Sequence, residues 1–185
     1  AEAQATEKLV RLPGCFLCYS PPENAPAVAP PPQAANGFVT FGSLNNPCKS
    51  NEQVYALWAQ LLSSLENSRL LMLQPVTETR EQVARYFEAR GISRARLEFL
   101  PWLKLADFWG AHHRIDIALD TFPYNGITTT CDALWMGIPV LTLPGKWPAS
   151  RAAAGILHVC GLQQFVAASP DDFVRIGNEL ARGVP

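Results

Sequence analysis

The chain has 185 residues, of which 48% are hydrophobic and 17% are charged, and its formal net charge is −1. This composition is typical of a globular domain with a core of its own and excludes an intrinsically disordered chain. The near-neutral charge, without blocks of like sign, and the lack of an apolar run of roughly 18 residues argue against a nucleic-acid surface and a membrane span, so neither is an expected partner.

The first part of the chain is rich in proline. Seven of the 16 prolines lie within the first 32 residues, and they include the clusters at 21–22 and 30–32. Proline is excluded from helix interiors and from central strands. We therefore expect residues 1–36 to be an extended arm or interdomain connector, and residues 37–185 to form the folded domain. Because the first residue is alanine, we also expect an excised piece of a longer protein.

The five cysteines are an odd number scattered among apolar residues. This usage favours free thiols in a reducing compartment, and we expect a cytoplasmic protein. Cys15 and Cys18 have the C-x-x-C spacing, but a metal site needs a second pair of ligands, which the sequence does not show. Redox motifs carry polar, proline or glycine residues between the cysteines, whereas Phe16-Leu17 favours a short apolar strand.

Beyond the arm, apolar strands alternate with amphipathic helices. In chain order, the sequence predicts a strand over 38–42, a helix over 51–65, a strand over 69–73, a helix over 77–90, a strand over 97–100, a helix over 103–112, a strand over 116–120, a helix over 128–137, a strand over 140–143, a helix over 149–159, a strand over 165–166 and a helix from Ser169 onward. Ser50 and Gln53 fit a capping box for the first of these helices. Apolar strands joined by short links to helices predict an α/β fold, an open, mostly parallel, Rossmann-like sheet flanked by helices.

The loop over residues 121–126 lies where a ligand is expected. It follows a buried strand and leads into the helix that begins near Thr128. In open parallel sheets, ligands bind beyond the carboxyl ends of the strands. The first turn of a helix has unpaired N–H groups and a partial positive charge, so a phosphate fits there. Gly126 permits a close approach to the backbone, and the hydroxyls of Thr128 and Thr129 can donate to phosphate oxygens.

Asp132 lies three and four residues beyond these threonines, on the same face of the helix. An acid at this distance is badly placed for phosphate and well placed to accept hydrogen bonds from a ribose. Together these residues predict a site for a nucleoside diphosphate. An alternative remains open, in which Thr128 is only an N-cap and Asp132 is a solvated acid favoured by the helix dipole.

A longer pattern indicates a family. The stretch NGITTTCDALWMGIPV at 125–140 is preceded by FVTFGSLNNPCK at 38–49 and HHRIDIALD at 112–120. Over residues 7–182 the chain resembles the catalytic region of O-linked N-acetylglucosamine transferases and their SPINDLY-like bacterial relatives. The resemblance implies the donor-binding half of a two-domain (GT-B) glycosyltransferase of the family 41 type, truncated at both ends. The acceptor half and the tetratricopeptide repeats of that family are absent from the chain.

The resemblance also implies roles for residues. Thr128, Thr129 and the helix N-terminus correspond to the site of the donor's diphosphate, and Asp132 to that of its ribose. Lys49 falls where the family has a catalytic lysine that neutralises the departing nucleotide, and Asn46 where it has a polar residue near the donor. The chain has no Asp-x-Asp pair for a divalent metal, so we expect metal-independent transfer without a cofactor.

The predicted function is therefore donor binding in an inverting protein O-glycosyltransferase. UDP-N-acetylglucosamine or a GDP-sugar is the expected donor, Ser or Thr of a protein is the acceptor through missing regions, and the isolated chain is expected to be inactive. Two alternatives remain open. One is another GT-B enzyme that uses nucleotide sugars, such as a small-molecule glycosyltransferase or an epimerase. The other is a non-catalytic protein-interaction module that uses the proline-rich arm and the aromatic residues around 101–110.

Overall fold

The computed structural model describes residues 6–10 and 13–183, and one parallel sheet forms its centre. The strands are β1 (Val39–Ser43), β2 (Ser68–Leu73), β3 (Leu97–Leu100), β4 (Ile117–Leu119) and β5 (Val140–Leu141). They lie in the order β3-β2-β1-β4-β5, and every pairing is parallel. The predicted fold class is confirmed.

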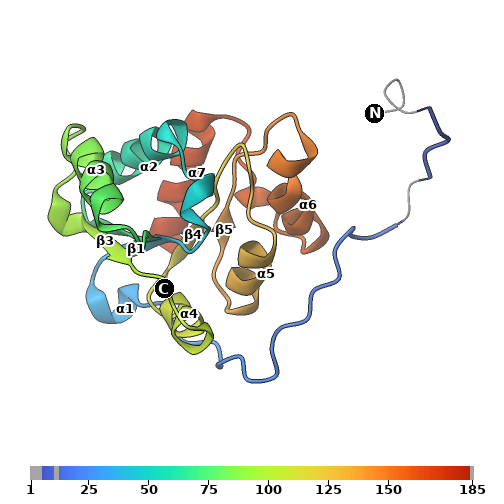
Figure 1. Ribbon diagram of the computed structural model, residues 1–185, viewed down its shortest axis with the longest axis horizontal. Helices are drawn as coiled ribbons and strands as arrows, with labels where there is room; N and C mark the ends of the chain where they lie inside the picture. Colours follow the sequence, from blue (N-terminus) through green and yellow to red (C-terminus); the bar gives the residue numbers. More distant parts are fainter. Residues whose placement is uncertain (1–5, 11–12, 184–185) are drawn as a thin grey trace.

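Helices cover both faces of the sheet (Figure 1). One face carries α2 (Glu52–Ser64), α3 (Thr77–Glu88) and α7 (Pro170–Gly183), and the other carries α4 (Leu105–His112), α5 (Thr128–Trp135) and α6 (Ala152–Val159). Alternate strand residues serve the two cores: Leu70 and Met72 pack in the first, and Leu71 and Leu73 in the second. Because both faces are buried, the strands are continuous apolar runs.

The order of the strands reverses between β1 and β4. From β1 the chain proceeds outward to β2 and β3, and it then returns to form β4 beside β1 before proceeding to β5 on the other side. Phe41 pairs with Ile117 at this central position. Such a reversal opens a crevice beyond the carboxyl ends of the two central strands, where ligands of open α/β sheets bind.

The proline-rich arm has no strand and no helix among its described residues until α1 (Gln33–Asn36). In Figure 1 the arm, in blue, runs past α6, α5 and α4 toward α1. Cys15 and Cys18 are exposed free thiols in this segment. The short strand predicted around them is therefore wrong, because the arm follows helices and has no neighbouring strand with which to pair.

Three of the predicted helix and strand positions can be compared in detail with the structure. The predicted helix start at Ser169 is confirmed, since the Asp172 N–H donates to the Ser169 hydroxyl at 3.1 Å. The capping box of Ser50 is wrong: Asn51 is the N-cap of α2 and accepts from two backbone N–H groups. The strand predicted over 165–166 is also wrong. This segment is a 3₁₀ turn, η5 (Gln163–Phe165), followed by one isolated bridge between Val166 and Thr142, the residue after β5. None of the described helices is long and apolar enough to cross a membrane.

Candidate functional site

Lys49 lies at the carboxyl end of the two central strands. It belongs to the 3₁₀ turn η2 (Pro47–Lys49), which follows β1. Its Nζ donates to the Asn125 carbonyl oxygen at 3.0 Å and lies 4.8 Å from the centroid of the Tyr124 ring. Partial burial lowers the pKa of Lys49, and the charge of Asp120 opposes that change. The fold thus brings the predicted catalytic lysine to the β4–α5 loop, residues 120–127.

Asn45 connects the same two segments more deeply. The Thr129 hydroxyl donates to Asn45 Oδ1 at 2.8 Å, and Asn45 is buried. A Cβ on Gly126 would lie 2.4 Å from Thr129 Oγ1 and 2.8 Å from Asn45 Oδ1. Gly126 is therefore required by this packing, in addition to any approach of a ligand. Asn45 was not among the predicted site residues, although it belongs to the same Asn-Asn pair as Asn46.

Asn46 has a local role in this structure. Its side chain is exposed, and its Oδ1 accepts from the Cys48 N–H at 3.0 Å, which caps η2. The cap fixes the turn that carries Lys49. The side chain of Asn46 thus contributes to the position of the lysine, and it faces solvent at the same edge of the sheet.

Asp120 holds the β4–α5 loop in place through hydrogen bonds from the loop to its buried carboxylate. Its Oδ1 accepts from the N–H groups of Gly126, at 2.7 Å, and Thr121, at 2.9 Å, and its Oδ2 accepts from the Thr142 hydroxyl at 2.7 Å. Burial raises the pKa of Asp120 to about 7, although these three hydrogen bonds and the charge of Lys49 act in the opposite direction. Since the Gly126 N–H points at Asp120, the N–H groups available to a ligand are those of the following threonines.

The N-terminus of α5 has unused donors. Ile127 is its N-cap and provides no side-chain cap, and Thr128 is its exposed first residue. The first N–H to donate within the helical pattern is that of Cys131, to the Ile127 carbonyl at 3.0 Å. The backbone N–H groups of Thr128, Thr129 and Thr130 donate to no described residue. The alternative in which Thr128 is the N-cap is therefore wrong, and the helix tip is open to an anion.

Asp132 is buried, with 6% of its surface exposed. Its Oδ1 accepts from the Tyr19 hydroxyl of the arm at 2.6 Å. Burial raises the pKa of Asp132, whereas the Tyr19 hydrogen bond and the charge of His112 lower it. The alternative of a solvated acid is wrong. Tyr19 could not be predicted as a site residue, because 113 residues separate it from Asp132.

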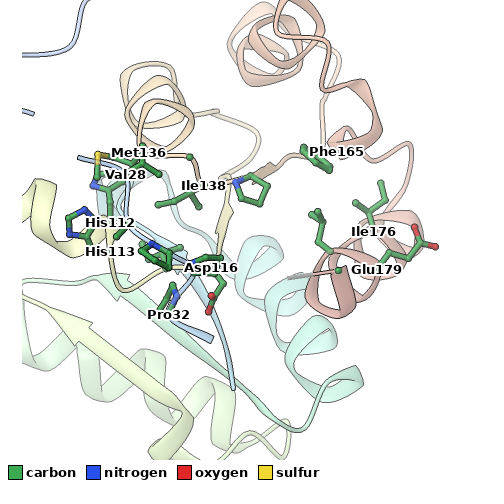
Figure 2. A pocket seen from close by; sticks show the side chains of 18 of the residues that line it. Val28, Pro32, His112, His113, Asp116, Met136, Ile138, Phe165, Ile176 and Glu179 are labelled. Carbon is green, nitrogen blue, oxygen red and sulfur yellow. The ribbon is translucent and has the colours of Figure 1, made fainter. Parts of the chain in front are cut away.

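Two hollows differ in size and position. A void of about 20 Å³ lies inside the core between the sheet and α5, and its mostly buried lining includes Asn45, Asp120 and His112. A cavity of about 550 Å³ lies at the opposite, amino edge of the sheet, among the arm, α5 and α7. Figure 2 shows Val28 and His112 on one side of that cavity, with Phe165 and Ile176 facing them. Among residues 6–10 and 13–183, no group of three His, Cys, Asp or Glu residues is arranged to hold a metal ion.

Comparison with known proteins identifies the family. The profile described as "Glycosyl transferase family 41" matches residues 32–184. The chain belongs to glycosyl transferase family 41. The family predicted from the 38–49 and 125–140 motifs is thereby confirmed.

Similar proteins extend this result. A probable UDP-N-acetylglucosamine–peptide N-acetylglucosaminyltransferase SPINDLY from Eustoma exaltatum subsp. russellianum is 41% identical over 182 residues, which are 96% of this chain and 20% of that protein. The SPINDLY protein of Arabidopsis thaliana is also 41% identical, with the same coverage. The chain spans about a fifth of the length of these curated relatives.

Solved structures agree with the fold. The structure of a Thermobaculum terrenum O-GlcNAc transferase mutant matches with a TM-score of 0.89 and 36% identity, and the match covers 96% of this chain and 34% of that one. A putative UDP-N-acetylglucosamine 2-epimerase from Listeria monocytogenes matches with a TM-score of 0.53, over 82% of this chain and 39% of that one, at 15% identity. The second match supports only the fold.

Proposed function

We propose that this chain is the donor-binding half of a protein O-glycosyltransferase. It binds a nucleoside diphosphate sugar, either UDP-N-acetylglucosamine or a GDP-sugar, and the longer enzyme transfers the sugar to Ser or Thr of a protein. The observation that carries this proposal is the convergence of Lys49, the Asn45–Thr129 contact and the open tip of α5 where the strand order reverses. The names of the relatives, which describe peptide N-acetylglucosaminyltransferases, support the substrate class.

The diphosphate is bound by the tip of α5. The unpaired N–H groups of Thr128, Thr129 and Thr130 and the exposed Thr128 hydroxyl donate to phosphate oxygens. Gly126 and Asp120 hold the preceding loop in the shape that directs these donors outward. Asp132, one turn deeper, accepts from the ribose.

Lys49 supplies the charge that transfer requires. Cleavage of the sugar–phosphate bond leaves negative charge on the departing nucleotide, and a preorganised cation stabilises it. Lys49 is held by the Asn125 carbonyl and by η2, whose cap is Asn46, so it reaches the diphosphate with little reorganisation. Lys49 and the dipole of α5 stabilise the negative charge on the departing nucleotide, without a metal ion or other cofactor.

The acceptor is assigned to other parts of the longer enzyme. The SPINDLY relatives are about five times the length of this chain, since it covers 20% of them. The isolated chain is therefore expected to bind nucleotide weakly and to catalyse no transfer.

Calorimetric titration of the chain with UDP, GDP and their sugars tests the proposal. We expect saturable binding with one stoichiometric site, and a rise in melting temperature that follows occupancy. Lys49→Ala and Asp132→Ala should remove both signals. Absence of binding to all four ligands would contradict donor binding and favour an interaction module, whereas transfer by the longer enzyme to a small molecule alone would favour another GT-B activity.

A further inference from the structure

A segment of the arm lies against the helix that carries the proposed donor site. The hydroxyl of Tyr19 donates to Asp132 Oδ1 at 2.6 Å, across 113 residues of sequence. Cys15 and Leu17 line the same groove as Leu134 of α5 and Ile156 of α6. Figure 1 shows the arm passing these two helices as an extended chain. The contact with Asp132 therefore lies beside a groove of about 320 Å³ that the arm, α5 and α6 line together.

The contact leaves one oxygen of Asp132 available. Oδ1 accepts from Tyr19, whereas Oδ2 accepts from no described residue and is not among the fully buried atoms that lack a partner. A carboxylate has room for several donors on its two oxygens. The bond on Oδ1 restricts rotation of the carboxylate, and it favours the ionised form, which is the better acceptor.

We propose that Tyr19 is a positioning residue of the ribose subsite, whose hydroxyl holds Asp132 Oδ1 so that Oδ2 faces the ribose hydroxyls of the bound nucleotide. This inference rests on the proposed function. It makes the donor site a product of two parts of the chain, α5 and the arm. Tyr19 lies outside the part that the family profile matches, which begins at residue 32.

The opposite role for Tyr19 makes the opposite prediction. If the phenol hydroxyl occupied the place of a ribose hydroxyl, it would compete with the nucleotide, and its removal would tighten binding. If the hydroxyl orients Asp132, its removal weakens binding, and only for ligands that carry the ribose hydroxyls. The sign of the effect and its dependence on the ligand therefore separate the two roles.

The experiment compares two nucleotides and three variants. Dissociation constants of UDP and 2′,3′-dideoxyuridine diphosphate are measured by calorimetry on the whole chain. Tyr19→Phe should weaken UDP binding about fivefold, the worth of one hydrogen bond, and leave the dideoxy nucleotide unchanged. Tyr86→Phe is the matched control, because its hydroxyl donates to the Glu52 carbonyl at 3.0 Å, away from the site. Leu17→Ala loosens the arm that carries the hydroxyl, so it should weaken UDP binding in the same direction as Tyr19→Phe and leave the dideoxy nucleotide unchanged.

Each outcome decides one of the two proposals. Unchanged or tighter UDP binding by Tyr19→Phe, or an equal loss for both nucleotides, would overturn the role of Tyr19. If wild-type protein binds UDP and Lys49→Ala does not, the proposed function stands even when the Tyr19 result is negative. If wild-type protein binds neither UDP nor GDP, the proposed function fails and the inference fails with it, and if it binds only GDP, the same comparison is made with GDP and 2′,3′-dideoxyguanosine diphosphate.

Discussion

The two ends of β4 carry the same kind of anchor. Asp116 precedes the strand, and its carboxylate accepts from the N–H groups of Gln33 at 2.9 Å and Thr40 at 2.8 Å. Asp120 follows the strand and accepts from the N–H groups of Thr121 and Gly126. Both are buried, and burial raises the pKa of each. Each carboxylate fixes a connecting segment to the edge of the sheet.

The surroundings of the two anchors differ. Asp116 borders the cavity of about 550 Å³ (Figure 2), whereas Asp120 borders an internal void of about 20 Å³. The amino edge receives the carboxyl ends of α4 and α5, at His113 and Met136, and these bring partial negative charge. The carboxyl edge receives the N-terminus of α5 and the ammonium of Lys49. Helix ends and charges, rather than the size of a cavity, therefore favour the carboxyl edge for a diphosphate.

The largest expected effect comes from exchanging the cations at the two edges for alanine. Lys49→Ala in the longer enzyme should lower kcat about 100- to 1,000-fold, because one preorganised group stabilises the leaving nucleotide. Arg114→Ala, just before β4, should leave kcat unchanged, since Arg114 lies at the opposite edge of the sheet and its ion pair with Glu98 is exposed. Steady-state transfer of labelled sugar measures both. A kcat of the Lys49 variant equal to that of the wild type would contradict the role of Lys49.

Replacement of Asp116 and of Asp120 by alanine distinguishes an effect on stability from an effect on nucleotide binding. Asp120→Ala leaves three buried donors without an acceptor, whereas Asp116→Ala leaves one buried and one half-buried donor, and each buried donor costs about 1–3 kcal/mol. Only Asp120→Ala should also weaken UDP binding, by about tenfold, because the β4–α5 loop moves and geometric errors of about 1 Å are costly. Urea unfolding and calorimetry measure the two effects. Equal loss of affinity in both variants would show that the edges are not functionally distinct.

Local sequence signals predicted the strand and the helix on either side of this site. Periodicity and end signals placed the strand before the β4–α5 loop and the helix after it. A local ambiguity explains one error: Ser50 and Asn51 are adjacent and both suit an N-cap, and Ser50 instead ends η2. Such one-residue choices depend on the backbone angles of the preceding turn.

Contacts between residues far apart in the chain could not be predicted from the sequence. Asn45 and Thr129 are 84 residues apart, and no periodicity relates them. Asp120 was visible as an acid that ends an apolar strand, but its three donors come from the loop and from beyond β5. These contacts exist only after the strand order is known, because parallel neighbours are separated by whole helices. The roles of the site residues in donor binding stay predictions.

The titration of Asp120 gives a third test. Its pKa is raised to about 7 in the folded chain, against about 3.9 in an unfolded one. Between these values the folded state binds the extra proton, so the free energy of unfolding should fall as pH rises, by up to about 1.4 kcal/mol per pH unit. Above about pH 7 the fall should cease.

Asp120→Asn is the variant for this measurement, because it removes the titration and keeps an oxygen for the two N–H groups. Urea unfolding of the wild-type chain and the variant gives the difference in stability at each pH. Asp116, Asp132 and His112 titrate in both proteins, so their contributions cancel in that difference. A difference that does not change between about pH 4 and 7 would refute the raised pKa.

The smallest effects come from adding one methyl group at each of two glycines. Gly126→Ala places a Cβ 2.4 Å from Thr129 Oγ1 and 2.8 Å from Asn45 Oδ1, and overpacking of this kind costs about 1–3 kcal/mol. Gly110→Ala, in α4, meets nothing within 4 Å and should stabilise the chain by about 0.5–1 kcal/mol through helix propensity. Urea unfolding should therefore give opposite signs. The clash at Gly126 pushes the segment after β1, which carries Asn45, away from α5. Only Gly126→Ala should therefore also weaken UDP binding. An unchanged dissociation constant would mean that the Asn45–Thr129 contact does not shape the site.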